Sequence, residues 1–282
     1  METIVESLRS ETPEIRAHAT DELSRLVKDG LTVQEGLTAL RGASHTFPPG
    51  KYDWLDSAAQ LVGAASAQPV PEYIPVVLEL YPTYNGKARV AALALLAKAD
   101  SREAAEAWMS IVRTYARSGG VTSLPVGPLE QKPRYADVLF PEMLEYTDVE
   151  SLATDIWHLC WTYCESGLLT SQSLLPYATR LVGAYRVLES ALVQAQQSDE
   201  IGWMWDDTYL PTREAAGLLL DLMGYVPDPS VEEALRGALQ LADPKPRAYA
   251  ATSLVRLGKA VGTEDLLSIA RSAEMRNVLH DR

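Results

Sequence analysis

The chain has 282 residues and carries 38 Asp and Glu against 25 Lys and Arg, which gives a net charge of −13. Its apolar content of 47% is enough for a substantial core, and the abundance of Ala and Leu over Phe favours helices over sheets. The net charge argues against binding to nucleic acid or anionic membranes, and no apolar run reaches the roughly 18 residues that a membrane-spanning helix needs.

Four segments along the chain share a helical pattern that starts at an arginine. Each arginine is followed by Ala three residues later and by Leu seven residues later, so that both lie on one helical face. Small Ala side chains let a neighbouring helix approach closely, and Leu one turn later fills the space between the helices. The four sets are Arg16, Ala19 and Leu23; Arg89, Ala92 and Leu96; Arg213, Ala216 and Leu220; and Arg247, Ala250 and Leu254.

The last two copies of this pattern are separated by a second helix that begins at Asp228, and another second helix begins near Thr263. A two-helix unit with a period in the thirties is typical of α-solenoids. The chain resembles the HEAT-repeat family, most clearly in the stretches 13–19 and 243–251. The resemblance implies an all-α, HEAT-like α-solenoid of about six or seven pairs of antiparallel helices with an irregular middle. In that family the repeat arginines tie adjacent repeats together.

Local signals divide the chain into three parts. Residues 1–118 are predicted to form N-terminal HEAT-like helical repeats, and residues 119–134 a long Gly/Pro loop without helical period. Residues 135–282 are predicted to form an acidic middle and C-terminal repeats, in one continuous array with the first part. Thr32–Glu35 and Asp100–Glu103 read as capping boxes, and Gly224 and Gly258 as helix stops.

The negative charge is concentrated in the segment Asp137–Asp228. This segment contains 15 acidic residues, three arginines and no lysine, so it carries nearly the whole net charge. It also contains four of the six tryptophans: Trp157, Trp161, Trp203 and Trp205. A concentrated negative field attracts cationic molecules, so the expected partner is a basic protein.

The segment 152–168 is predicted to be a central helix with a wide apolar arc. His158 lies about 200° around the helix from Cys160, at about 100° per residue, so these residues and Cys164 do not form a metal site. Asp155, His158 and Glu165 gather on the opposite face. That face is interpreted as solvated, with general acid–base chemistry as the alternative.

The best candidate for a functional site is the segment 199–209, which mixes four carboxylates with aromatic residues. Aromatic residues give contact area and carboxylates engage Lys or Arg, as in protein-binding hot spots. The predicted partner-binding residues are Glu200, Trp203, Trp205, Asp206, Asp207 and Tyr209. The alternative is that the two tryptophans fill a gap between irregular repeats. A magnesium-binding run is not complete there, because Leu210 stands where a third Asp would be needed.

These observations favour a non-enzymatic binding protein that captures a basic protein, such as an immunity or inhibitor protein for a cationic toxin. The alternatives are a general scaffold or adaptor, and a HEAT-like enzyme of the DNA glycosylase or bilin-lyase type. The enzyme would need a pocket lined by Trp157, Trp161 or His158. We expect no catalytic residues, metal, cofactor, nucleic acid or membrane. Without a signal peptide and with two cysteines in one helix, a soluble cytoplasmic location is expected.

Overall fold

The computed structural model describes residues 1–50, 56–196, 202 and 206–281. Within these residues the protein is all-helical and has no β-strand, as the composition predicts. The chain divides into two compact units, Met1–Ile156 and Trp157–Arg282. The division therefore lies inside one helix, α10 (Glu150–Glu165), and not in the segment 119–134.

The first unit contains a succession of helices. They are α1 (Glu2–Leu8), α2 (Pro13–Asp29), α3 (Val33–Gly42), α4 (Ser57–Ala65), α5 (Tyr73–Leu80), η1 (Tyr81–Thr83), α6 (Gly86–Lys98), α7 (Arg102–Tyr115), α8 (Gly127–Glu130), η2 (Pro133–Tyr135), α9 (Ala136–Leu139) and η3 (Glu142–Tyr146).

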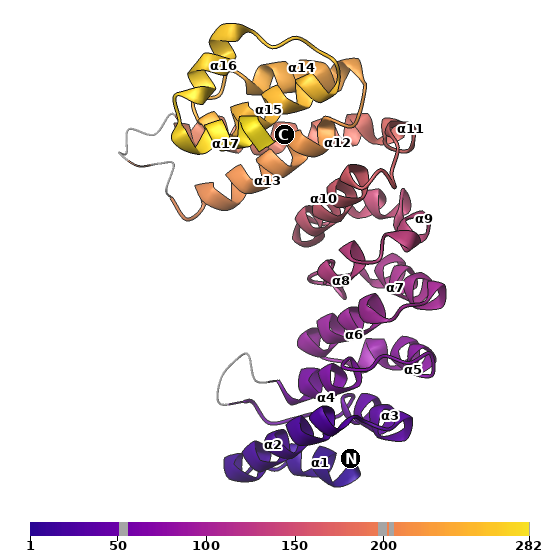
Figure 1. The fold of residues 1–282 in the computed structure, drawn as a ribbon. Coiled ribbons are helices and arrows are strands. Elements are labelled where there is room, and N and C mark those ends of the chain that lie inside the picture. The colour runs from indigo at the N-terminus through magenta and orange to yellow at the C-terminus, as the bar shows by residue number, and fades with distance from the viewer. Residues whose placement is uncertain (51–55, 197–201, 203–205, 282) are drawn as a thin grey trace. The chain divides into compact units, whose positions relative to one another are not determined.

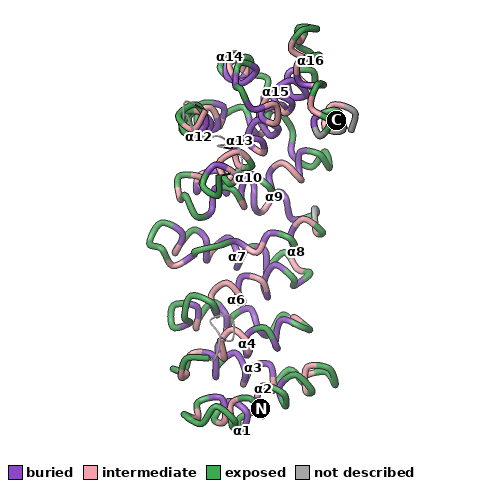
Figure 2. The backbone as a smooth tube through the Cα atoms, turned by 90° about the vertical axis from the view of Figure 1, so that its left-hand side faces the viewer, coloured by how far each residue is buried: buried purple, intermediate pink, exposed green. Residues whose placement is uncertain are grey.

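Helices of the first unit form two layers. The even-numbered helices α2, α4, α6 and α8 pack each on the next, and the odd-numbered helices α1, α3, α5, α7 and α9 do the same. Figure 1 shows α4, α6 and α8 along one side and α3, α5, α7 and α9 along the other. The layers are joined by contacts such as those of α3 with α4 and of α6 with α7. Buried residues concentrate where the two layers face each other (Figure 2).

Helix starts in this unit confirm one predicted capping box and correct the other. The Thr32 hydroxyl accepts the amide of Glu35 at 3.3 Å, and the Glu35 carboxylate accepts the amide of Thr32 at 2.9 Å. At α7 the capping residue is Ser101, whose hydroxyl accepts the amide of Ala104 at 3.1 Å. The prediction placed this cap at Asp100, one residue too early, because Ser and Asp both serve as caps and adjoin here.

The segment 119–134 is more ordered than the predicted loop. It contains α8 and the start of η2, and Val121, Leu124 and Leu129 are buried. The Tyr81 hydroxyl donates to the carbonyl of Gly120 at 3.1 Å, and the Asp155 carboxylate accepts the amide of Leu124 at 3.0 Å. Gly and Pro residues interrupt the helical periodicity of the sequence here. The buried apolar side chains nevertheless pack the segment against the core.

The second unit contains the end of α10 and a group of packed helices. They are α11 (Ser171–Leu174), η4 (Leu175–Tyr177), α12 (Ala178–Gln196), α13 (Tyr209–Met223), α14 (Pro229–Ala238), α15 (Pro244–Arg256), α16 (Thr263–Ala270) and α17 (Ala273–Asp281). α12 packs on α13 and α14, α13 packs on α15, and α15 packs on α16 and α17. The predicted starts at Asp228 and Thr263 are confirmed to within one residue.

α13 and α15 pack extensively on each other. A Cβ on Gly217 would lie 3.0 Å from the Tyr249 ring, so a larger residue there would have to displace the ring. Gly258 follows α15 with φ of +72°, as a glycine stop does, whereas the Gly224 cap of α13 has φ of −62°. Gly224 is required for another reason, because a Cβ there would lie 2.7 Å from the Ser253 hydroxyl.

The four repeated patterns all lie in helices, namely α2, α6, α13 and α15. Every predicted Ala and Leu of these patterns is buried, with at most 4% of its surface exposed: Ala19, Leu23, Ala92, Leu96, Ala216, Leu220, Ala250 and Leu254. The predicted core faces are therefore confirmed. Across the described residues, no helix is long and apolar enough to cross a membrane.

Candidate functional site

The start of α13 contains the described part of the predicted partner-binding segment. Asp206 and Asp207 are exposed there. The Asp206 carboxylate accepts the amides of Thr208 (2.8 Å) and Tyr209 (3.2 Å) and also the Thr208 hydroxyl. These donors hold the pKa of Asp206 below its usual value, so this carboxylate stays ionised. Glu200, Trp203 and Trp205 lie outside the described residues.

Tyr209 differs from the other predicted contact residues because it is buried, with 3% of its surface exposed. Its hydroxyl donates to Asp243 at 2.8 Å, and burial together with this carboxylate raises the pKa of Tyr209. The ring therefore cannot supply contact area to a partner. Tyr209 instead connects the start of α13 to the start of α15, and we remove it from the partner-contacting set.

Asp243 is the centre of a polar network between α13 and α15. It is 1% exposed and caps α15 by accepting the amide of Lys245 at 2.9 Å. The Arg213 guanidinium lies 3.7 Å from its other oxygen, and the Lys245 ammonium lies 2.6 Å from Glu214. These contacts agree with the expectation that a repeat arginine connects neighbouring repeats.

The N-terminal repeat arginines contact backbone instead of carboxylates. Arg16 donates to the carbonyl of Ser10 at 2.7 Å, and Arg89 donates to that of Pro82 at 2.8 Å. Arg89 also lies over the Tyr81 ring at 5.7 Å. Both arginines thus fasten their helix to the turn that precedes it, which is a structural role.

Much of the acidic segment is neutralised by bases that lie outside it in the sequence. In the first unit, three acids pair with arginines of α7 and of the turn that follows it: Asp137 with Arg102 (2.9 Å), Glu142 with Arg113 (2.8 Å) and Asp148 with Arg117 (3.3 Å). The Arg113 pair is bidentate, and it lowers the pKa of Glu142. The local field of residues 137–148 is therefore weaker than their sequence suggests.

In the second unit the buried Asp221 pairs with Arg256 at 3.0 Å, and Asp228 caps α14 by accepting the amide of Ser230 at 2.8 Å. The exposed carboxylates of the segment that make no ion pair within the described residues are Glu150, Glu165, Asp206 and Asp207. Of these, Asp206 and Asp207 are adjacent, so they form the densest unpaired negative charge of the described segment.

The predicted faces of α10 are confirmed except at Asp155, which is half-buried and accepts the amide of Leu124 at 3.0 Å. Cys160 and Cys164 are buried free thiols, His158 and Glu165 are exposed, and burial raises the pKa of Cys160 well above its usual value. His158 stacks on Trp161 with ring centroids 6.0 Å apart. A buried thiol with a raised pKa is a poor nucleophile and metal ligand. In the described part of the chain, no group of three or more His, Cys, Asp and Glu residues could hold a metal ion.

Comparisons with known proteins give no assignment for this arrangement. No family model, no curated protein and no solved structure matches the chain. Function must therefore be argued from the residues themselves.

Proposed function

We propose that this protein is a non-enzymatic, HEAT-like α-solenoid that captures a basic protein partner. The two-layer succession of helices in the first unit supports this architecture, since the second helix of each pair lies in the other layer. The burial of all four repeated Ala and Leu pairs supports it as well. Solenoids present extended surfaces, and binding is their usual role.

The observation that supports a basic partner is the negative charge of Asp206 and Asp207, which make no ion pair within the described residues. Both carboxylates are exposed, and Asp206 is kept ionised by the hydrogen bonds of Thr208 and Tyr209. We propose that they act with Glu200, Trp203 and Trp205, carboxylates engaging Lys or Arg and tryptophans supplying contact area. An inhibitor or immunity protein for a cationic toxin uses such a surface, because charge complementarity accelerates capture.

Affinity capture tests this proposal. The tagged protein, the double variant Asp206→Asn/Asp207→Asn and a control are immobilised and exposed to the native lysate. The proteins that each one binds at low and at high salt are identified by mass spectrometry. The control is Glu22→Gln/Glu79→Gln, which removes the same charge from two exposed residues of α2 and α5.

The proposal predicts one basic protein that the wild type and the control retain at low salt and release at high salt. The Asp206/Asp207 variant retains much less of it. Equal retention by all three proteins, or no basic protein at all, contradicts the proposal. The activity of the captured protein with and without this chain then separates an inhibitor from an adaptor.

A further inference from the structure

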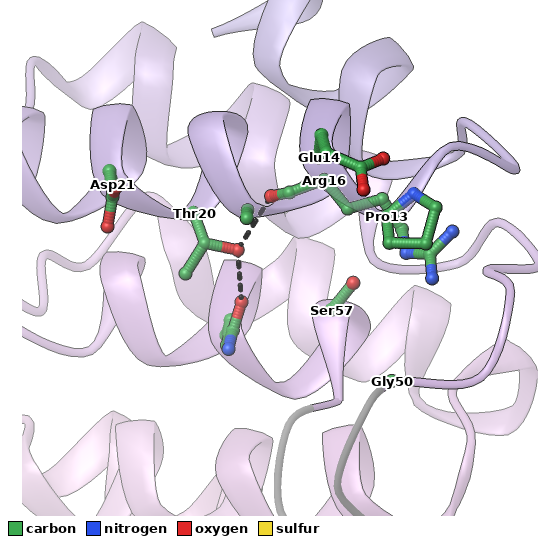
Figure 3. A pocket seen from close by; sticks show the side chains of 9 residues that line it. Pro13, Glu14, Arg16, Thr20, Asp21, Gly50 and Ser57 are labelled. Atoms are coloured by element: carbon green, nitrogen blue, oxygen red, sulfur yellow. Dashed lines mark hydrogen bonds between the residues drawn. The ribbon is translucent and has the colours of Figure 1, made fainter.

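Two adjacent pockets form a groove between α2 and α4 in the first unit, and Figure 3 shows the first of them. The first pocket has a volume of about 390 Å³ and includes Pro13, Ala17 and Ser57 in its lining. The second has a volume of about 330 Å³ and includes Leu23 and Val27. Thr20 of α2 and Gln60 of α4 line both pockets, so the two pockets adjoin.

Polar contact holds the two helices together where the pockets meet. The Thr20 hydroxyl donates to the carbonyl of Arg16 at 3.0 Å and approaches the Gln60 side chain at 3.4 Å. The Ser57 hydroxyl borders the same hollow (Figure 3). An incoming peptide therefore finds hydroxyl and amide groups between the two pockets.

The first pocket is negatively charged. Glu14 and Asp21 line it, both are exposed, and neither makes a hydrogen bond or ion pair within the described residues. The third charged group of the lining, Arg16, donates to three backbone carbonyls at 2.7, 3.0 and 3.4 Å, so its guanidinium is held by the backbone and not by Glu14 or Asp21. The free charges of this pocket thus favour a cation.

The second pocket contains a glycine that the fold does not require. Gly63 lies inside α4 with an ordinary helical backbone, and a Cβ on it would meet nothing within 4 Å. Glycine inside a helix costs about 1 kcal/mol relative to alanine. Nothing in the described chain packs against Gly63 to require its small size, so the groove stays open along the backbone of α4.

We propose that the α2–α4 groove binds an extended peptide segment in which a cationic residue stands four positions from an apolar residue. The cation lies between Glu14 and Asp21, and the apolar side chain enters the second pocket beside Leu23 and Gly63. The lining residues of the two pockets on α2 are centred about seven residues apart, or about 11 Å at 1.5 Å per residue. Side chains four positions apart lie on one face of an extended peptide, and four residues span about 13 Å, which is close to that separation. This site uses no residue of the segment 199–209, so it stands independently of the function proposed above.

The test uses a defined probe, the acetylated and amidated peptide Ala-Arg-Ala-Ala-Ala-Leu-Ala, titrated into the full-length protein and followed by amide chemical shifts. Gly63→Leu fills the second pocket, and it preserves the fold because the position is open and leucine favours helix. Gly183→Leu is its control, since Gly183 lies inside α12 with nothing within 4 Å of its Cβ position. Thermal unfolding confirms that both variants fold.

The charged pocket is tested by Glu14→Gln/Asp21→Asn, with Glu22→Gln/Glu79→Gln as the control of equal charge change. The expected result is saturable binding that shifts the amides of Thr20 and Gly63. Binding is lost in Gly63→Leu and weakened about fivefold in the Glu14/Asp21 variant or when the peptide's Arg is replaced by Gln. Both controls and Asp206→Asn/Asp207→Asn bind as the wild type does. No saturable binding, or binding that Gly63→Leu leaves unchanged, overturns the proposal.

Discussion

The pair of Asp221 with Arg256 gives the sharpest prediction about stability. Asp221 lies in the last turn of α13, where the partial negative charge of the helix end disfavours a carboxylate. Arg256 of α15 donates to both its carboxylate and its backbone carbonyl at 3.0 Å. The guanidinium also lies over the Tyr225 ring at 4.4 Å. One arginine therefore neutralises the buried acid and completes the end of α13.

The perturbation is Arg256→Met, which keeps most of the side-chain volume and removes the charge. Removing one partner of a buried ion pair costs about 3–5 kcal/mol, because the other charge stays buried. The Asp221 side chain is 2% exposed but that of Arg256 is 23% exposed, which favours the lower end. We expect the free energy of unfolding, measured by urea denaturation and circular dichroism, to fall by about 3 kcal/mol.

A matched control and a double variant make the reasoning refutable. Arg236→Met breaks the exposed pair of Arg236 with Glu232, and it should cost less than about 1 kcal/mol. Asp221→Asn/Arg256→Met should lose less than the sum of its single variants, by about 2 kcal/mol, because no uncompensated charge remains. If Arg256→Met costs no more than Arg236→Met, the pair is not the connection between α13 and α15 that we describe.

Three further predictions concern packing, pH and thiol reactivity. Gly217→Ala should lower the free energy of unfolding by about 1–2 kcal/mol, since the new methyl group would lie 3.0 Å from the Tyr249 ring. Glu142→Gln should cost less than about 1 kcal/mol at pH 7, because Arg113 stabilises the ionised carboxylate. The pKa of Glu142 in the folded protein is below its ordinary value of 4.5. Its contribution to the free energy of unfolding is therefore present above pH 4.5 and is lost as the pH falls through the folded pKa. Urea denaturation of the wild type and of Glu142→Gln at pH 7 and pH 3 checks this. The Cys160 thiol should resist iodoacetamide at pH 8 in the native protein and react after unfolding, as measured by mass spectrometry.

Each of these has an outcome that would contradict it. Gly183→Ala is the control for Gly217→Ala, and it should stabilise α12 slightly because its position is open. If Gly183→Ala lowered the free energy of unfolding as much as Gly217→Ala does, the clash with Tyr249 would not be the cause of the loss. A Glu142→Gln difference that persists at pH 3 would mean that charge is not its origin. Rapid native alkylation of Cys160 would mean that α10 opens readily.

Helical elements could be predicted from the sequence because their signals are local. Arg213 and Arg247 belong to a pattern whose Ala and Leu are confirmed as core, and Thr32 forms the predicted capping box. Where two local signals compete, as at Asp100 and Ser101, the prediction is wrong by one residue. α8 was missed because Gly and Pro mask an apolar spacing that only packing against the core reveals.

The candidate site was harder to predict, because the number of charged residues in a segment does not indicate which of them form ion pairs. Asp137, Glu142 and Asp148 pair with arginines 29 to 35 residues earlier in the chain. The contact of Tyr209 with Asp243 could be predicted from a spacing in the sequence. Tyr209 precedes Arg213 by four residues, and Asp243 precedes Arg247 by four. In a solenoid, equivalent positions of neighbouring repeats lie side by side, so aligning the two sequence patterns predicts this contact.

The most direct test of the proposed function is the association rate of the captured partner as a function of ionic strength. We predict that the rate constant of the wild type falls steeply with salt, as it does for electrostatically steered capture. At low salt, Asp206→Asn/Asp207→Asn should associate severalfold more slowly than Glu22→Gln/Glu79→Gln, with a smaller change in dissociation. A rate that does not depend on salt, or equal slowing in both double variants, would contradict capture by the acidic segment.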